Sequence, residues 1–354
     1  MAKSLKKGNE AIALAAVLGG CEAFFGYPIT PQNEVPEFLS KYMIEHGKVF
    51  VQAESEVAAI NMVYGAAGAG VRVMTSSSSP GIALKQEGIS YIAGAELPCV
   101  IVNVMRGGPG LGGIQPSQAD YKQVTRGGGN GDYYTIAYAP ENLQETVDIM
   151  KMSFEVADYY RNPVMIAVDG LIGQMMESVD MDRPIPKRNL QPKTWATTGH
   201  QEKEERHIVS SLYLDPLVLS KHNEKLHQKY MQIKENEQLY EKIDVDDAEY
   251  IIVAYGTMAR ICRSAMEECR KEGIRVGMIR PITIWPYPEK AFRDLQPTIK
   301  GILCAELSMG QMIDDVMIVN QGRFPVHFFG KAGGILPEVE EISEAIHKMK
   351  RGVQ

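Results

Sequence analysis

The sequence lacks several features that would narrow its function at once. Its five cysteines include no Cys-x-x-Cys pair, which argues against a disulfide framework, a zinc site or an iron–sulfur ligand set and favours buried free thiols. Acidic residues outnumber basic ones, and the formal charge of −7 argues against a nucleic-acid-binding surface. The apolar stretch at residues 11–18 is too short to span a bilayer, so we expect a cytoplasmic protein without a membrane segment.

What the sequence does contain is a regular alternation of apolar runs with helical patterns. Runs typical of strands occur at residues 23–25, 48–53, 71–76 and 98–105. The last of them is almost unbroken, which indicates an interior strand of a parallel sheet. This rhythm predicts an α/β fold with two doubly wound, mainly parallel-sheet domains at residues 1–170 and 249–354, joined by a partly helical linker at residues 171–248.

The linker contains a charged amphipathic segment at residues 215–243, which predicts one surface helix that acts as an interdomain or intersubunit strut. Its apolar face consists of Leu219, Leu226, Tyr230, Ile233 and Tyr240. His222 and His227 also lie there, without a further ligand at suitable spacing. We interpret both as solvated helix residues and expect no metal site.

Polar segments follow several predicted strands, where a parallel sheet places its ligand contacts. Prolines stiffen the segment Tyr27-Pro28-Ile29-Thr30-Pro31, which would present the Thr30 hydroxyl. Glu56 begins an apolar helix, and from its position alone it fits a helix-start charge as well as a functional carboxylate. The serine run at residues 76–79 is equally consistent with a ligand-binding loop and with a helix cap.

Residues 106–132 interrupt the alternation, with nine glycines among 27 residues and no hydrophobic period. A loop of this length inside a compact domain is usually functional or disordered, and its start at the end of a buried strand favours a binding loop. No Gly-Lys-Ser/Thr is present, which excludes a P-loop, and the glycine spacing does not fit a dinucleotide fingerprint. Arg106 directly follows the buried strand, which weakens its interpretation as an ordinary surface arginine.

Three motifs occur in order: Tyr27-Pro-Ile-Thr-Pro31, Glu56 followed nine positions later by Gly65, and Arg106-Gly-Gly-Pro109. Over nearly the whole chain, the sequence resembles the α subunit of the 2-oxoacid:ferredoxin oxidoreductases, most of all the branched-chain (3-methyl-2-oxobutanoate, or 2-ketoisovalerate) members. Residues 249–354 resemble the C-terminal domain of transketolase-type enzymes. The resemblance implies a thiamine-enzyme pyrimidine-type domain and an enzyme that oxidises 2-oxo acids to acyl-CoA and CO₂, with electrons passed to ferredoxin.

The resemblance also implies roles for particular residues. Glu56 would be the catalytic carboxylate that holds a proton on the aminopyrimidine ring of thiamine diphosphate, the cofactor that serves as the electron sink. Arg106 and Thr30 would bind the substrate carboxylate, because a planar guanidinium matches a carboxylate in bidentate geometry. The positions implied around the cofactor, besides Glu56, are Tyr27, Pro28, Ile29, Ser78 and Ser79.

The substrate tail is indicated by a departure from the family pattern. Relatives that act on 2-oxoglutarate have hydroxyl-bearing residues after Arg-Gly-Gly-Pro, whereas this chain has Leu111, Gly112, Gly113 and Ile114. We therefore expect an apolar substrate tail that contacts Leu111 and Ile114. Arg126 could instead fold back as a second carboxylate clamp, so 2-oxoglutarate or pyruvate stays open as a substrate, as does a non-catalytic scaffold subunit.

The chain also lacks the Gly-Asp-Gly…Asn signature by which thiamine enzymes bind magnesium and diphosphate. The resemblance therefore implies that this chain supplies only the pyrimidine half of the cofactor site and is inactive alone. A β subunit would carry the diphosphate and Mg²⁺ site, while a γ subunit and a ferredoxin-like δ subunit would complete the complex. Iron–sulfur clusters would lie on these partners, ferredoxin would accept the electrons, and coenzyme A would be the co-substrate.

Overall fold

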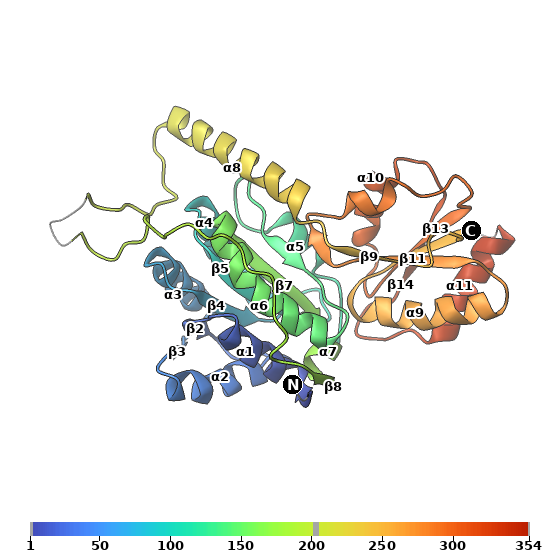
Figure 1. Ribbon diagram of the computed structural model, residues 1–354, viewed down its shortest axis with the longest axis horizontal. Helices are drawn as coiled ribbons and strands as arrows, with labels where there is room; N and C mark the ends of the chain where they lie inside the picture. The colour runs from blue at the N-terminus through green and yellow to red at the C-terminus, as the bar shows by residue number, and fades with distance from the viewer. Residues whose placement is uncertain (1–2, 201–204, 353–354) are drawn as a thin grey trace.

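The structure, a computed structural model, describes residues 3–200 and 205–352 and places them in two lobes side by side along the long axis (Figure 1). The first lobe holds a seven-stranded sheet and the second a five-stranded sheet. Both sheets are mainly parallel, so the predicted fold class is confirmed. Over these described ranges, no helix combines the length and the apolar character that crossing a bilayer requires.

The first sheet has the strand order β12-β6-β7-β5-β4-β2-β3, and all its strands are parallel except β12, which pairs antiparallel with β6. Every residue of β5 and β7 is buried, as the unbroken apolar run at residues 98–105 predicted for an interior strand. The strands are β2 (Ala23–Gly26), β3 (Val49–Gln52), β4 (Val73–Ser77), β5 (Cys99–Met105), β6 (Ile136–Tyr138), β7 (Pro163–Asp169) and β12 (Thr283–Trp285).

Helices cover this sheet in two groups: α1 packs against α2 and α6, whereas α3 packs against α4. A small antiparallel pair, β1 (Ser4–Lys7) with β8 (Met176–Val179), lies beside α6. The helices are α1 (Gly8–Leu18), α2 (Glu34–Glu45), α3 (Glu56–Gly68), α4 (Ser79–Gly94), α5 (Tyr121–Arg126), α6 (Leu143–Tyr160) and α7 (Gly170–Gln174).

The second lobe has the strand order β14-β13-β10-β11-β9, in which only β9 runs antiparallel to its neighbour. One face of α9 is buried in its core, including Cys262 and Cys269, and the five cysteines are all buried and free, as expected from their pattern. The elements are β9 (Tyr240–Ile243), β10 (Tyr250–Val253), α9 (Gly256–Lys271), β11 (Val276–Pro281), η1 (Glu289–Phe292), β13 (Gly301–Glu306), α10 (Met312–Asn320), β14 (Val326–Gly330) and α11 (Val339–Arg351).

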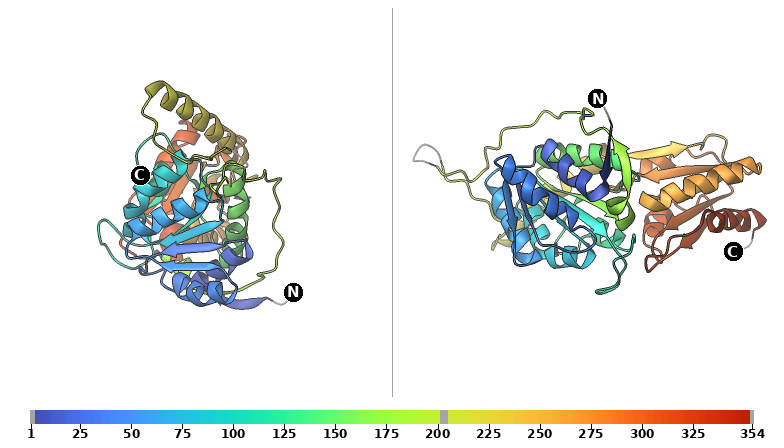
Figure 2. Two further views of the ribbon diagram at one scale, coloured as in Figure 1. Left: turned by 90° about the vertical axis from the view of Figure 1, so that its left-hand side faces the viewer. Right: turned by 90° about the horizontal axis from the view of Figure 1, so that it is seen from below.

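The linker differs from its prediction in two respects. The amphipathic helix is α8 (Pro216–Asn236), and it ends before β9 because residues 240–243 form a ladder with β11 instead of a further helical turn. His222 is not simply solvated, since its Nε2 atom lies 2.7 Å from the Gly94 carbonyl oxygen. Between β8 and α8 the described chain follows an extended path along the first lobe (Figure 2).

The glycine-rich segment at residues 106–132 is also more ordered than predicted, because it contains the short helix α5. Two strands cross the expected domain boundaries: β9 joins the second sheet from within the linker, and β12 joins the first sheet from within residues 249–354. The division at residues 170 and 248 stays a prediction about folding units.

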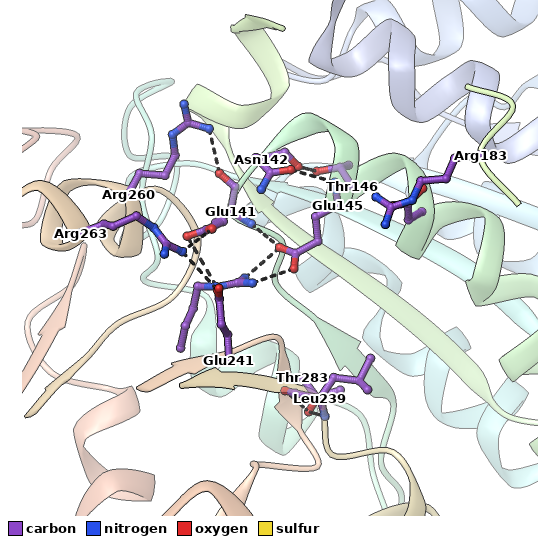
Figure 3. A network of polar contacts seen from close by, with 12 residues as sticks. Glu141, Asn142, Glu145, Thr146, Arg183, Leu239, Glu241, Arg260, Arg263 and Thr283 are labelled. Atoms are coloured by element: carbon purple, nitrogen blue, oxygen red, sulfur yellow. Dashed lines mark hydrogen bonds and ion pairs between the residues drawn. The ribbon is translucent and has the colours of Figure 1, made fainter. Parts of the chain in front are cut away.

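A charged network fastens the two lobes together. Arg280 of β11 donates to both carboxylate oxygens of Glu145 on α6 at 2.8 Å and to Glu241 of β9 at 2.9 Å. Arg263 of α9 bridges Glu141 and Glu241 at 2.7 and 3.1 Å. In Figure 3 the Glu141, Glu145, Glu241 and Arg263 side chains point toward one another, so that carboxylates of both lobes share these arginines.

A second set of contacts anchors the glycine-rich segment to the second lobe. Gln118 donates to the Tyr255 carbonyl at 2.8 Å and accepts from the Leu307 amide at 2.9 Å. Asp315 accepts from Tyr121 at 2.5 Å and from Arg126 at 2.6 Å. The second lobe therefore fixes the loop that begins at Arg106.

Candidate active site

The residues singled out from the sequence follow neighbouring strands. The strands β3, β2, β4 and β5 are adjacent and parallel, so their carboxyl ends meet at one edge of the sheet. Thr30 follows β2, Glu56 follows β3, Ser78 and Ser79 follow β4, and Arg106 follows β5. The topology thus brings these residues to one side of the first lobe.

Glu56 is the first residue of α3 and is only 6% exposed. Ser55 caps the helix, since its hydroxyl accepts from the Ala58 amide at 3.1 Å. In the described part of the chain, no hydrogen bond to the Glu56 carboxylate is present. A Cβ on Gly81 would lie 2.7 Å from Glu56 Oε1, so glycine there leaves room for the carboxylate. The helix therefore has another cap, and the Glu56 carboxylate is buried and free to bind a ligand.

The serine run divides into two kinds of side chain. The hydroxyls of Ser77 and Ser78 are buried, and neither has a hydrogen-bond partner among the described residues. Ser79 is fully engaged: its hydroxyl donates to Asp120 Oδ2 at 2.6 Å and accepts from the Arg106 amide at 3.0 Å. Ser77 and Ser78 thus offer unpaired polar groups beside Glu56, whereas Ser79 ties β4 to the start of the glycine-rich segment.

Arg106 is buried, with 6% of its surface exposed, and is not a surface loop arginine. Its Nη1 donates to the Thr30 carbonyl at 2.8 Å and its Nη2 to the Leu111 carbonyl at 3.0 Å. Its Nε is buried and has no partner within the described ranges. The guanidinium therefore joins the Thr30 loop to the glycine-rich segment and retains donors for an anion.

The loop after β2 is partly open. Tyr27 and Pro28 are exposed, whereas Ile29 and Thr30 are half-buried. The Thr30 hydroxyl accepts from Asn33 Nδ2 at 3.3 Å. Thr30 and Ile114 line the same hollow of about 320 Å³. The structure thus brings a predicted carboxylate-binding residue and a predicted tail contact together.

The predicted tail contacts are uncovered in this chain. Leu111 is 81% exposed and Ile114 is 55% exposed, so the described residues do not close an apolar pocket around them. Arg126, the alternative clamp, is instead paired with Asp315 of the second lobe at 2.6 Å. Its guanidinium is therefore committed to a contact between the lobes.

Sequence reasoning missed Asn103 and Asp120. Asn103 Nδ2 donates to Asp120 Oδ2 at 2.9 Å, and Asn103 Oδ1 accepts from the Ser79 amide at 3.0 Å. Burial raises the pKa of Asp120, while the hydrogen bonds from Ser79 and Asn103 and the charge of Arg106 oppose that rise. Asn103 could have been noticed as the one polar residue in an apolar strand, but Asp120 carries no such local signal.

Two hollows lie on opposite sides of the first sheet. One of about 690 Å³ is lined by Ser79, Gly108, Asp120 and residues of the second lobe, including Met309. A larger one of about 1170 Å³ is lined by Glu96, Arg161 and other residues at the amino ends of the strands. The smaller hollow is at the edge where parallel sheets bind ligands. Within the described ranges, no three His, Cys, Asp or Glu side chains are arranged to hold a metal ion.

Comparisons with known proteins cover both lobes. Residues 14–242 match the family model for the thiamine diphosphate-binding part of pyruvate flavodoxin/ferredoxin oxidoreductases, and residues 248–342 match that for core domain II of pyruvate:ferredoxin oxidoreductase. The chain is 47% identical to ketoisovalerate oxidoreductase subunit VorB of Methanothermobacter thermautotrophicus, over 99% of this chain and 98% of that protein. It is 33% identical to 2-oxoglutarate synthase subunit KorA of Methanothermobacter marburgensis, over 97% and 98% of the two chains.

Solved structures agree with these matches. The 2-oxoglutarate:ferredoxin oxidoreductase from Magnetococcus marinus, with 2-oxoglutarate, coenzyme A and succinyl-CoA bound, superposes with a TM-score of 0.88 at 25% identity. The match covers 98% of this chain but 65% of that one. A split-gene transketolase in an inactive tetramer gives a TM-score of 0.61 at 14% identity, a likeness of fold.

Proposed function

This chain belongs to the 2-oxoacid:ferredoxin oxidoreductase family, and on that premise we propose that it is the α-type subunit of the branched-chain enzyme, with 2-ketoisovalerate as substrate. As a member, it is an oxidoreductase subunit of a thiamine diphosphate-dependent enzyme. The observation that carries the branched-chain assignment is the identity of 47% to a ketoisovalerate subunit, against 33% to a 2-oxoglutarate subunit of similar coverage. The apolar Leu111 and Ile114 support the same choice.

The residues at the carboxyl edge of the first sheet fit the pyrimidine half of thiamine diphosphate. A buried carboxylate without a partner, two unpaired serine hydroxyls and the space beside Gly81 form a polar recess around Glu56. Bound there, the cofactor supplies the electron sink for decarboxylation. Glu56 would hold a proton at a ring nitrogen of the aminopyrimidine, and Ser77 or Ser78 would hydrogen-bond the ring.

Arg106 orients the substrate in this proposal. Its unpaired Nε and the remaining Nη hydrogens can donate to a carboxylate, while its two bonds to backbone carbonyls fix the plane of the guanidinium. Thr30 lies beside it, because Arg106 holds the Thr30 carbonyl at 2.8 Å. Together they would place the 2-oxo group near the cofactor and leave the tail toward Leu111 and Ile114.

Partner subunits complete the site. The exposure of Leu111 and Ile114 supports a pocket that closes only against another subunit. We assign the diphosphate and Mg²⁺ to a β subunit, and the iron–sulfur clusters to partners that include γ and ferredoxin-like δ subunits. Coenzyme A would be the co-substrate, ferredoxin the electron acceptor, and the cytoplasm the location of the complex.

The test is a complex reconstituted from this chain and its partner subunits, assayed for 2-ketoisovalerate-dependent reduction of a viologen. Glu56→Gln should lower kcat by at least about a hundredfold, the scale of a lost proton-transfer group, while gel filtration shows intact assembly. Turnover close to that of the wild type would show that Glu56 does not have this role.

A further inference from the structure

The proposed mechanism does not use Lys85, although this residue lies within the same recess. Lys85 belongs to α4 and is completely buried. Its ammonium donates to Thr75 Oγ1 at 2.7 Å and to the Ser76 carbonyl at 3.1 Å. Both acceptors are neutral, so these hydrogen bonds hold the group in place without balancing its charge.

The spacing along α4 turns Lys85 toward the helix that begins at Glu56. Gly81, Lys85 and Gly88 are four and three residues apart, which places them on one face of α4. A Cβ on Gly81 would lie 2.7 Å from Glu56 Oε1, and one on Gly88 would lie 2.5 Å from the Ile60 side chain. Since α3 contacts both glycines, Lys85 lies between them on the surface that faces Glu56 and Ile60.

A buried lysine is costly unless its charge is balanced. Burial lowers the pKa of Lys85 to about 7, and the negative charge of Glu56 opposes that shift. Within the described part of the chain, Glu56 is the ionisable group whose charge acts on Lys85. An uncharged side chain such as methionine would fill this interior position without the desolvation cost, so packing alone does not account for a lysine.

We propose that Lys85 is a positioning residue that supplies the positive charge behind Glu56 and stabilises its carboxylate at the pyrimidine site. The inference rests on the proposed function, because it concerns the same carboxylate. When the shared proton lies on the ring nitrogen, Glu56 is negative, and the nearby ammonium stabilises that charge. Lys85 would act through Glu56 and would not touch the substrate.

The first experiment needs no cofactor and no activity. In the isolated chain labelled at the lysine side-chain nitrogens, NMR titration gives the pKa of Lys85, assigned by the signal that is lost in Lys85→Met. Glu56→Gln should lower this pKa by at least about one unit, because the charge that favours the ammonium is removed. An unchanged value would overturn the pairing.

Lys229 is a matched control within the same spectra. Burial lowers its pKa to about 8, and its acidic partner is Glu96, at 3.5 Å and remote from Glu56. Its pKa should not respond to Glu56→Gln. If it does respond, the variant is misfolded, and Glu56→Asp replaces it: the shorter carboxylate should also lower the Lys85 pKa, and an unchanged pKa would overturn the pairing.

The second experiment uses the reconstituted complex. Lys85→Met should lower kcat about tenfold or more, with KM for 2-ketoisovalerate changed less than about threefold, whereas Lys229→Met should retain activity. Added to Glu56→Gln, Lys85→Met should cause no further loss, because both changes act on one carboxylate. Equal losses in both backgrounds would overturn the positioning role. Full activity of Glu56→Gln would instead overturn the proposed function, which the NMR titration tests separately.

Discussion

Arg280→Met tests whether the charged network between the lobes stabilises the fold. The Arg280 side chain is 5% exposed and contacts Glu141, Glu145 and Glu241. Removing one partner of a buried ion pair costs about 3–5 kcal/mol, because the other charge stays buried. Arg263 still pairs with Glu141 and Glu241, so Glu145 loses most, and we expect a loss near the lower figure, about 3 kcal/mol.

The assay is guanidinium denaturation of the isolated chain, followed by tryptophan fluorescence, since Trp285 lies in β12 where the lobes meet. Arg275→Met is the matched control: Arg275 precedes the same strand, is 57% exposed, and leaves Glu249 paired with Lys300. The control should cost less than about 1 kcal/mol. A loss for Arg280→Met as small as that of the control would refute this explanation of how the lobes are joined.

Two further predictions concern the recess around Glu56. The isolated chain should bind thiamine diphosphate weakly or not at all, because it lacks the diphosphate and magnesium signature; tight magnesium-dependent binding by calorimetry would contradict the half-site assignment. Between the folded pKa of Lys85, about 7, and its usual value of 10.5, the unfolded chain binds one more proton, so this group makes the free energy of unfolding rise with pH by up to about 1.4 kcal/mol per unit. The contribution is lost as pH falls through about 7. Urea denaturation at pH 7 and pH 9 should therefore show a rise for the wild type relative to Lys85→Met, and equal slopes would contradict it.

The larger elements could be predicted because their signals are local. An unbroken apolar run sufficed for β5, and helical spacing sufficed for α2 and most of α8. The short strands could not be predicted in the same way. The sequence Ser-Leu-Lys-Lys of β1 is mostly polar, and its partner β8 lies far along the chain. Residues 240–243 continue the pattern of α8, and only pairing with β11 makes them a strand.

The site shows the same division. Glu56, Arg106 and Thr30 could be selected because motifs and strand ends mark them, and the topology brings them to one edge. Ser77 and Lys85 could not be selected from local sequence. In the sequence Lys85 resembles any charged helix residue, and only the close approach of α3 to α4 shows that it is buried toward Glu56.

The central claim is that this subunit serves a branched-chain 2-oxo acid. The most direct test compares kcat/KM for 2-ketoisovalerate and 2-oxoglutarate in the reconstituted complex with a viologen acceptor. Each buried methylene contributes about 0.8 kcal/mol, and a distal carboxylate without a partner loses several kcal/mol, so 2-ketoisovalerate should be favoured at least about tenfold. Arg126 is held by Asp315 and should not rescue the dicarboxylate. Equal or better use of 2-oxoglutarate would contradict the assignment.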